Sequence, residues 1–315
     1  MTVVKNVRLF PRTPDTPAVD VEITEGRFSR ISPAEDAAHD STQPGTGTAP
    51  TGIEVIDGAG RILLPSLGDV HAHLDSNRMG QTFRPHTADG TLHGFIKNDR
   101  ENWRGGERSI ADQAAYAIGK IVASGGTRIR SHAQVDADCG LERFHGVKAA
   151  LEAHADVLDF QIVAFPQAGI VREQGVRELL DAALAEGADL VGGLDPLLYD
   201  RDPVAHLDTV FALADKHGKG IDIHLHEAGT AGLFSLEEIA ARTRAAGTAG
   251  HVTVSPAFAL KMNPEPEVAK VLDALAEAGV VLTTVAPAKG VLPQALIRER
   301  RMALEIGRAS CRERV

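Results

Sequence analysis

The sequence predicts an α/β protein: a TIM-like (β/α) barrel that lacks its eighth strand, with a small N-terminal domain of the β-sandwich type. Three observations lead to this prediction. Residues 1–63 alternate apolar and polar side chains and break at Gly or Pro, which is typical of strands and turns. From residue 64 onward, short apolar strands alternate with helical stretches, which indicates a parallel sheet. No Gly-rich phosphate loop follows the first of these strands, which disfavours the alternative, an open doubly wound sheet.

Three segments are therefore expected. They are an incomplete β-domain over residues 1–63, the barrel over residues 64–304 and a polar tail over residues 305–315. The seven expected barrel strands cover residues 67–74, 127–135, 158–167, 188–196, 220–227, 251–258 and 279–287. The helices between and after them cover residues 110–124, 141–155, 175–187, 203–218, 235–247, 265–279 and 292–307, and several end at Gly, which commonly terminates a helix.

Composition narrows the class of partner. The chain has 315 residues, of which 43% are apolar and 24% charged, so a large folded core is expected. The formal charge of −10 argues against nucleic acid or an anionic membrane as the main partner. The N-terminal segment lacks a signal-peptide apolar core, and the chain has only 2 cysteines. A cytoplasmic protein acting on a small molecule is expected, and assembly into a homo-oligomer stays open.

Two histidines close the first barrel strand. His71 and His73 are two residues apart, so their side chains point to the same face of the strand. That face lines the barrel interior at the carboxyl-terminal rim, where barrel active sites lie. Asp75 follows them. The pattern favours a metal chelate over the alternative, a pair of histidines with ordinary surface or core partners.

A second histidine pair closes the fifth strand in the segment IDIHLHE. His224 and His226 share one face, and Glu227 follows. A third imidazole from across the barrel would complete a platform with an open coordination position, as in catalytic metal sites. Water bound there would have a pKa lowered to about 7, and Glu227 would shuttle its proton. The alternative for Glu227 is a solvated acid at a helix N-terminus, and His226 either lines the pocket or has no role.

The segments GDVHAHLD, GGTRIRSHAQVD, DFQIVAFPQAGI and IDIHLHE, in this order, resemble bacterial cytosine deaminases of the amidohydrolase superfamily. The resemblance covers about residues 60–290. It implies that His71, His73 and His224 hold one divalent metal ion, zinc or iron. It further implies that a metal-bound hydroxide attacks the amidine-like carbon, that Glu227 passes the proton to a ring nitrogen, and that ammonia leaves.

The same resemblance assigns substrate contacts. Gln167 matches a family glutamine that binds the pyrimidine amide edge, and a side-chain amide can donate and accept at once. Its alternative is a turn glutamine after Pro166. His132 matches a family histidine at the end of the second strand, with a packed strand-end histidine as its alternative. Asp195 closes the fourth strand and is the third expected substrate contact.

The chain departs from the family in two places. The sixth strand has Ser255 followed by Pro256 where the family has Ser-His, and proline carries no side-chain donor. The family also supplies a metal-linked aspartate from an eighth strand, and no such strand is expected here. The string EIGRASCRERV resembles translated adapter sequence at a broken gene end. We therefore expect genuine sequence to end near Leu304 and the native gene to continue.

The sequence thus predicts a metal-dependent hydrolytic deaminase of a cyclic amidine or pyrimidine such as cytosine. One alternative is a related hydrolase acting on another cyclic amide or amidine, for example a triazine, creatinine-like or dihydropyrimidine ring. The other alternative is an inactive fragment or pseudoenzyme, because Pro256 and the missing aspartate remove two expected groups.

Overall fold

A computed structural model describes residues 1–10, 13, 15–34, 46–48, 52–285, 294–300, 302 and 304–307. The chain falls into two compact units, Met1–Ser66 and Leu67–Val315. The predicted β-domain lies in the first unit and the predicted barrel in the second. Among the described residues, no helix is both long and apolar enough to cross a membrane.

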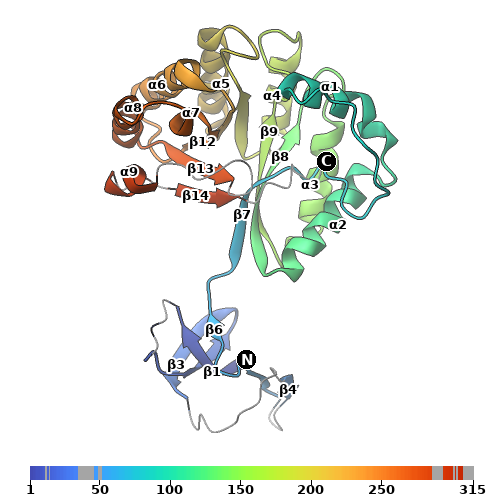
Figure 1. Cartoon of the computed structure of the whole chain (residues 1–315). Coiled ribbons are helices and arrows are strands. Elements are labelled where there is room, and N and C mark those ends of the chain that lie inside the picture. Colours follow the sequence, from blue (N-terminus) through green and yellow to red (C-terminus); the bar gives the residue numbers. More distant parts are fainter. Residues whose placement is uncertain are drawn as a thin grey trace. The chain divides into compact units, whose positions relative to one another are not determined.

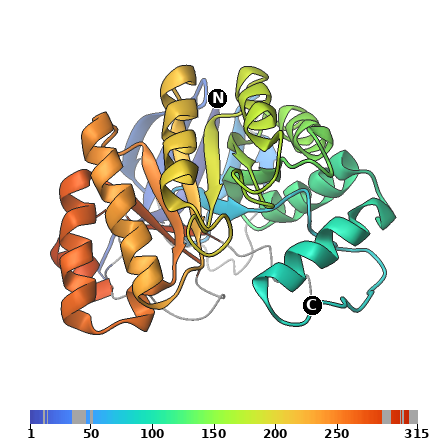
Figure 2. The same cartoon turned by 90° about the horizontal axis from the view of Figure 1, so that it is seen from above.

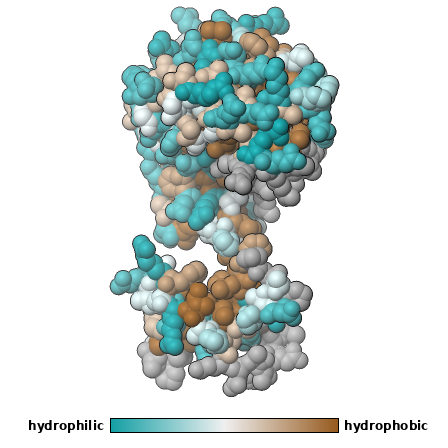
Figure 3. All heavy atoms as spheres, turned by 90° about the vertical axis from the view of Figure 1, so that its left-hand side faces the viewer, coloured by the Kyte–Doolittle hydropathy of each residue, from teal (hydrophilic) through white to brown (hydrophobic). Residues whose placement is uncertain are grey.

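The N-terminal unit is built from strands, as predicted. They are β1 (Thr2–Leu9), β2 (Val19–Thr24), β3 (Arg27–Pro33), β4 (Thr46–Thr48), β5 (Glu54–Asp57) and β6 (Ile62–Leu63). The described strands form one sheet in the order β3-β2-β1-β5-β4, with β6 paired to β1, where the sequence had predicted a sandwich-type arrangement. Val7 and Val21 form the buried apolar part of this unit. Apolar side chains also remain on its surface (Figure 3), among them Phe10 and Phe28, both more than 60% exposed.

The second unit contains an eight-stranded parallel sheet. Its strands follow one another in chain order: β7 (Leu67–Ala72), β8 (Gly126–Gln134), β9 (Asp159–Phe165), β10 (Leu190–Leu194), β11 (Gly220–Leu225), β12 (Val252–Ala257), β13 (Val281–Val285) and β14 (Leu304–Gly307). The predicted class, a TIM-like α/β barrel, is confirmed. Figures 1 and 2 show the helices arranged around the outside of the strands.

One detail of the fold prediction is corrected, because the described chain does contain an eighth strand. β14 pairs in parallel with β13, with Leu282 opposite Leu304 and Val285 opposite Gly307. Its Cα atoms also come within 8 Å of those of β7, the first strand of the sheet. Residues 305–307, expected to belong to the tail, therefore lie in a strand. The polar run that suggested a tail begins after Gly307 and lies outside the described residues.

Most of the helices cover the outer face of the sheet. The described helices are α1 (Leu92–Asn102), α2 (Ile110–Ala123), α3 (Glu142–Glu152), α4 (Val176–Ala185), α5 (Pro203–His217), α6 (Gly229–Ala246), α7 (Ala259–Met262), α8 (Glu265–Ala278) and α9 (Gln294–Glu299), with a 3₁₀ turn η1 at Trp103–Gly105. Local chemistry fixes their ends. α5 begins where the Asp202 side chain accepts a hydrogen bond from the Ala205 N–H and Pro203 takes the first helical position, and it ends at Gly218 with φ +62°.

Strand alternation divides the barrel into an apolar outer layer and a polar interior. On β11, Ile221, Ile223 and Leu225 belong to the hydrophobic core between sheet and helices. The residues between them, Asp222 and His224, point the other way and contact polar groups of other strands. The interior is therefore polar where most packed barrels are apolar, and the polar side chains cluster around the histidines predicted from the sequence.

Candidate metal centre and active site

The structure brings four buried histidines together inside the barrel. His71, His73, His132 and His224 each offer one ring nitrogen, and these nitrogens all lie within 4.8 Å of one another. The four side chains come from three strands or their ends: β7, β8 and β11. Their residues are at most 4% exposed. The three histidines predicted to bind metal thus lie together with His132, which the sequence had assigned to the substrate.

Strand geometry explains this convergence. His71 lies in β7 and His73 directly after it, two residues apart and hence on one face. Ser131 of β8 pairs with Ala72, which places His132 beside this pair. His224 reaches the cluster from β11, where it lies opposite Leu194 of β10.

The ring nitrogens of the cluster have few protein partners. Nε2 of His73 lies 3.1 Å from Nε2 of His224. Nδ1 of His71 bonds to the hydroxyl of Ser255 in β12. Nδ1 of His132 and Nδ1 of His224 are buried without a hydrogen bond. Buried polar atoms of native proteins nearly always have a partner, so several open imidazole nitrogens converging on one point fit a bound divalent cation.

Electrostatics agrees with this arrangement. Burial first, and then the neighbouring His132, holds the pKa of His71 well below its ordinary value, and the same two causes act on the pKa of His224. Neutral imidazole is the form that binds a metal ion, so the site keeps these ligands ready at neutral pH.

A charged layer lies beside the cluster in the barrel interior. Asp222 of β11 accepts a hydrogen bond from Arg130 of β8 at 3.1 Å, and the same guanidinium lies 3.3 Å from the Thr253 hydroxyl. The other carboxylate oxygen of Asp222 lies 3.3 Å from Nε2 of His132, although the angles fall short of a hydrogen bond. This fully buried carboxylate thus places a negative charge beside the His132 ring.

Glu227, the predicted proton shuttle, follows β11 and is fully buried. One carboxylate oxygen accepts hydrogen bonds from the backbone N–H groups of Leu197 and Leu198 at 2.7 and 2.8 Å. The other accepts from the hydroxyl of Ser235 in α6. Burial raises the pKa of Glu227, while the bonds from Ser235 and Leu198 act in the opposite direction. A carboxyl group with a raised pKa is suited to carrying a proton near neutral pH.

Asp195 lies at the end of β10 and organises the chain around Glu227. Its carboxylate accepts hydrogen bonds from the backbone N–H of His226 at 2.6 Å and of Glu227 at 3.2 Å. Nδ1 of His226 lies 2.9 Å from its other oxygen. Asp195 has φ +38°, an unusual value for a residue other than glycine. These bonds show Asp195 tying the end of β10 to the end of β11, with its predicted contact to substrate left as a proposal.

Gln167 lies just beyond β9 and is buried. Its side-chain N–H donates to Asp99 of α1 over 3.4 Å. Phe165, two residues earlier, packs against His224 with ring centroids 4.2 Å apart and also contacts His73 and His132. No pattern in the sequence marks Phe165 as part of a site. A phenylalanine at the end of a buried strand has the signature of an ordinary core residue.

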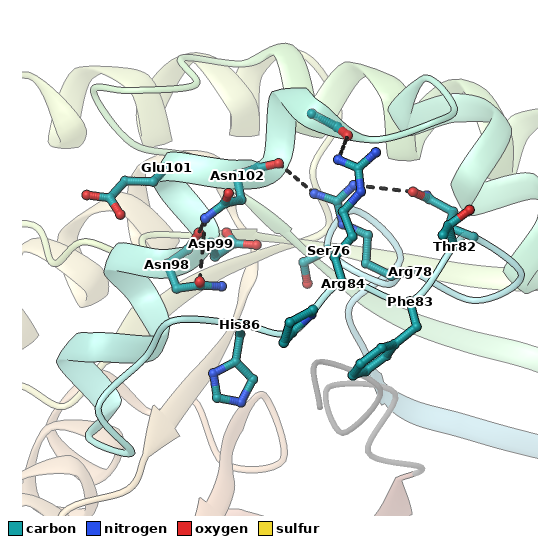
Figure 4. A pocket seen from close by; sticks show the side chains of 13 residues that line it. Ser76, Arg78, Thr82, Phe83, Arg84, His86, Asn98, Asp99, Glu101 and Asn102 are labelled. Atoms are coloured by element: carbon teal, nitrogen blue, oxygen red, sulfur yellow. Dashed lines mark hydrogen bonds between the residues drawn. The ribbon is translucent and has the colours of Figure 1, made fainter.

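A polar cavity of about 270 Å³ opens next to Asp99, between α1 and the segment that follows β7 (Figure 4). Two arginines in its wall are held by backbone carbonyls: Arg78 donates to Asn102 O at 2.7 Å, and Arg84 donates to Gly105 O at 3.1 Å. The histidine cluster is not among its lining residues, which are Ser76, Arg78, Gln81, Thr82, Phe83, Arg84, Pro85, His86, Asn98, Asp99, Glu101, Asn102 and Gly105. Asp99 therefore connects this cavity to Gln167.

A buried ion network holds α1 over the ends of the strands. Arg143 of α3 is fully buried and donates to Asp75 at 2.9 Å and to Asp99 at 2.6 Å. Asp75 also accepts a hydrogen bond from the backbone N–H of Gln134 at 3.0 Å. Ile96 of α1 packs with Phe165 and Leu194. Breaking such a buried pair leaves an uncompensated charge, so the network fixes α1 in place.

Comparison with known proteins places the chain in a family. Residues 107–305 match the amidohydrolase family, Amidohydro_3, and the chain belongs to that family. The predicted resemblance is thereby confirmed. Among curated relatives, N-isopropylammelide isopropyl amidohydrolase of Pseudomonas sp. (strain ADP) is 28% identical over 237 residues, 73% of this chain and 58% of that protein. The chain spans between 52% and 58% of the length of the curated relatives it matches.

Solved structures agree on the fold. The crystal structure of N-isopropylammelide isopropylaminohydrolase from Burkholderia multivorans is similar, with a TM-score of 0.85 and 36% identity, covering 97% of this chain and 74% of that one. The structure of 5-methylcytosine deaminase from Klebsiella pneumoniae liganded with 5-fluorocytosine gives a TM-score of 0.77 at 24% identity, with the same coverage. At that lower identity the likeness shows the fold alone.

Proposed function

We propose that this chain belongs to a metal-dependent hydrolase that removes an amino or alkylamino group from a ring carbon of a nitrogen heterocycle. One observation carries the proposal. Four buried imidazoles lie with their ring nitrogens within 4.8 Å of one another at the carboxyl ends of parallel strands. Barrel enzymes have their active sites at that end. The family of the chain supports hydrolysis of a C–N bond.

His71, His73 and His224 are the proposed metal ligands, with His132 as a fourth candidate. A bound divalent ion would supply Lewis acidity and lower the pKa of water to about 7. The Ser255 hydroxyl holds Nδ1 of His71, which leaves Nε2 of that ring for the ion. The lowered pKa of His71 and of His224 keeps these two rings neutral, which favours metal binding at neutral pH.

The remaining roles follow from the chemistry of the side chains. Glu227 accepts a proton from water and returns it to a ring nitrogen or to the departing amine, because its raised pKa lies nearer to the working pH. Gln167 presents an amide that can donate to and accept from the N–C=O edge of a heterocycle. Pro256 of β12 offers no donor, so the stabilisation of developing charge depends on the groups already named.

The preferred ring is proposed to be a triazine of the ammelide type, with cytosine as the alternative. The isopropylammelide hydrolase of Burkholderia multivorans supports the preference for a triazine over cytosine, since it shares 36% identity over 97% of this chain. The 5-methylcytosine deaminase likeness, at 24% identity, supports only a shared fold. Both rings present an amide edge that Gln167 can bind.

Amine release tests the proposal. The chain, loaded with zinc, iron or manganese, is incubated with N-isopropylammelide, ammelide, cytosine, isocytosine, 5-methylcytosine and creatinine. We expect isopropylamine or ammonia from at least one ring, and loss of that release after chelation. Turnover of none of them by the metal-loaded chain would contradict the proposal.

A further inference from the structure

A second histidine–carboxylate group lies outside the metal cluster, formed by the loop after β10 and the first turn of α5. Asp200 is 3% exposed, and His206, in the first turn of α5, is fully buried. Nδ1 of His206 lies 2.6 Å from an oxygen of Asp200. Nε2 of the same ring lies 3.3 Å from the backbone nitrogen of Leu194. A backbone N–H can only donate, so Nε2 is the acceptor and Nδ1 carries the hydrogen that Asp200 receives.

The carboxylate of Asp200 holds the loop that carries Gln167. It accepts hydrogen bonds from the backbone N–H groups of Ile170 at 2.8 Å, Val171 at 3.1 Å and Arg172 at 3.3 Å. Gly169 makes this approach possible, with φ +83° and a position where an added Cβ would lie 2.2 Å from the Asp200 carboxylate. Every backbone N–H from Ile170 to Arg172 therefore points at one buried carboxylate.

The segment that ends in Asp200 also holds Glu227. It begins at Asp195, whose carbonyl accepts a hydrogen bond from the Tyr199 N–H at 2.9 Å. Between them, the N–H groups of Leu197 and Leu198 donate to the Glu227 carboxylate. Asp200 thus fixes one end of the short segment whose backbone N–H groups donate to Glu227, the proposed proton shuttle.

We infer that Asp200 and His206 are positioning residues of the hydrolytic site. The pair joins the loop after β9, which presents Gln167, to the loop after β10, which holds Glu227. It therefore sets the distance between the group that binds the ring edge and the group that moves the proton. This inference rests on the proposed function for its catalytic consequence, while its structural part concerns only the two loops.

The chain provides a matched control on the same helix. His217, at the other end of α5, lies with Nε2 2.6 Å from the carboxylate of Asp181 in α4. Asp181 is partly exposed and also binds Lys216. Substituting it breaks a histidine–aspartate pair of equal length that touches neither active-site loop.

The experiment compares Asp200→Ala with Asp181→Ala in the metal-loaded chain. Hydrogen–deuterium exchange is followed in peptides covering residues 166–172, 195–200 and, as an internal reference, 252–257. We expect Asp200→Ala to accelerate exchange at least about tenfold in the first two segments and not in the third.

A misplacement of about 1 Å can lower the rate of catalysis by about 10²-fold, so we expect a fall in kcat/KM of that order for Asp200→Ala. KM should rise through Gln167 and kcat should fall through Glu227. The exchange rates and kcat/KM of Asp181→Ala should stay within about twofold of the wild-type values.

Two further variants cover the case in which Asp200→Ala does not fold. Asp200→Asn keeps the shape and loses part of the acceptor capacity, so an intermediate effect is expected. His206→Asn keeps a donor near the position of Nδ1 and should retain more activity than His206→Ala. Unchanged exchange in residues 166–172 and 195–200, or equal effects of the Asp200 and Asp181 substitutions, would overturn the inference. If the wild-type chain releases no amine from any heterocycle, the proposed function fails, and the exchange measurement alone decides whether the pair holds the loops.

Discussion

In the part of the chain that the structure describes, buried histidines fall into two kinds. His206 has both ring nitrogens in hydrogen bonds, one with Asp200 and one with the backbone of Leu194. His132 has neither ring nitrogen in a hydrogen bond, and His224 leaves Nδ1 without one. A histidine with both ring nitrogens hydrogen-bonded holds the backbone in place. A group of buried histidines whose ring nitrogens lack such partners indicates a ligand-binding site. Burial and residue type are the same in both cases, and only the partners differ.

Replacing one histidine of each kind gives the largest contrast. His224→Leu should abolish metal binding and bring amine release to the limit of detection, yet leave the free energy of unfolding of the metal-free chain nearly unchanged. His206→Leu should lower that free energy by about 1.5–3 kcal/mol, because Asp200 loses a donor to a buried charge. Urea unfolding and metal analysis measure both effects. Equal losses of stability in the two variants would show that the two kinds of histidine do not differ in their structural role.

Glu227→Gln tests whether a buried carboxylate with hydrogen-bond partners on both oxygens still serves in proton transfer. Glu227 has protein donors on both oxygens. We expect kcat to fall by about 10²- to 10⁴-fold while metal content stays the same, because an amide cannot carry the proton. Steady-state kinetics of amine release provides the measurement, with Glu237→Gln, an exposed acid of α6, as the control. Unaltered kcat would exclude Glu227 as the proton shuttle.

Ser255→Ala tests the contact between the Ser255 hydroxyl and His71 of the cluster. Without it, the ring of His71 loses the partner that fixes its orientation. Loss of such a supporting group typically weakens metal binding by about 10- to 100-fold. Competition with a chelating dye should show that loss, with Ser124→Ala at the end of α2 as the control. An unchanged dissociation constant would mean that Ser255 does not orient the ligand.

The pH dependence of the metal-free chain gives the smallest expected effect. The pKa of His71 and of His224 lies well below the ordinary value of 6.5, chiefly through burial. Below pH 6.5 the unfolded chain therefore binds more protons than the folded one. The free energy of unfolding should fall as the pH decreases, by up to about 1.4 kcal/mol per pH unit for each imidazole. Urea unfolding between neutral and mildly acidic pH should show this slope, and His224→Leu should reduce it. Equal slopes in the wild-type chain and in His224→Leu would contradict the lowered pKa of His224.

Much of the fold and of the histidine cluster could be predicted because the signals are local. His71 and His73 share a strand face through a spacing of two, and IDIHLHE places His224 by the same rule. The regular alternation of strands and helices predicts the barrel without knowledge of any contact. The eighth strand was missed because β14 is short and the polar residues after it dominate the pattern.

The supporting groups could not be predicted, because they depend on contacts between distant segments. Ser255 meets His71 across 184 positions of sequence. Asp200 binds amides 28 to 30 positions earlier in the chain, and its sequence surroundings are typical of a loop before a helix. The place of His132 among the other three rings could not be read from the sequence, since a single histidine at a strand end carries no spacing pattern.

Cobalt titration tests the central claim most directly. The chelator-stripped chain is titrated with Co²⁺, and the visible spectrum reports its coordination. We predict saturation at one equivalent, with the bands of a nitrogen-ligated ion, and loss of those bands in His224→Leu but not in His206→Leu. Absence of saturable binding, or identical spectra for both variants, would show that the four buried imidazoles do not form a metal site.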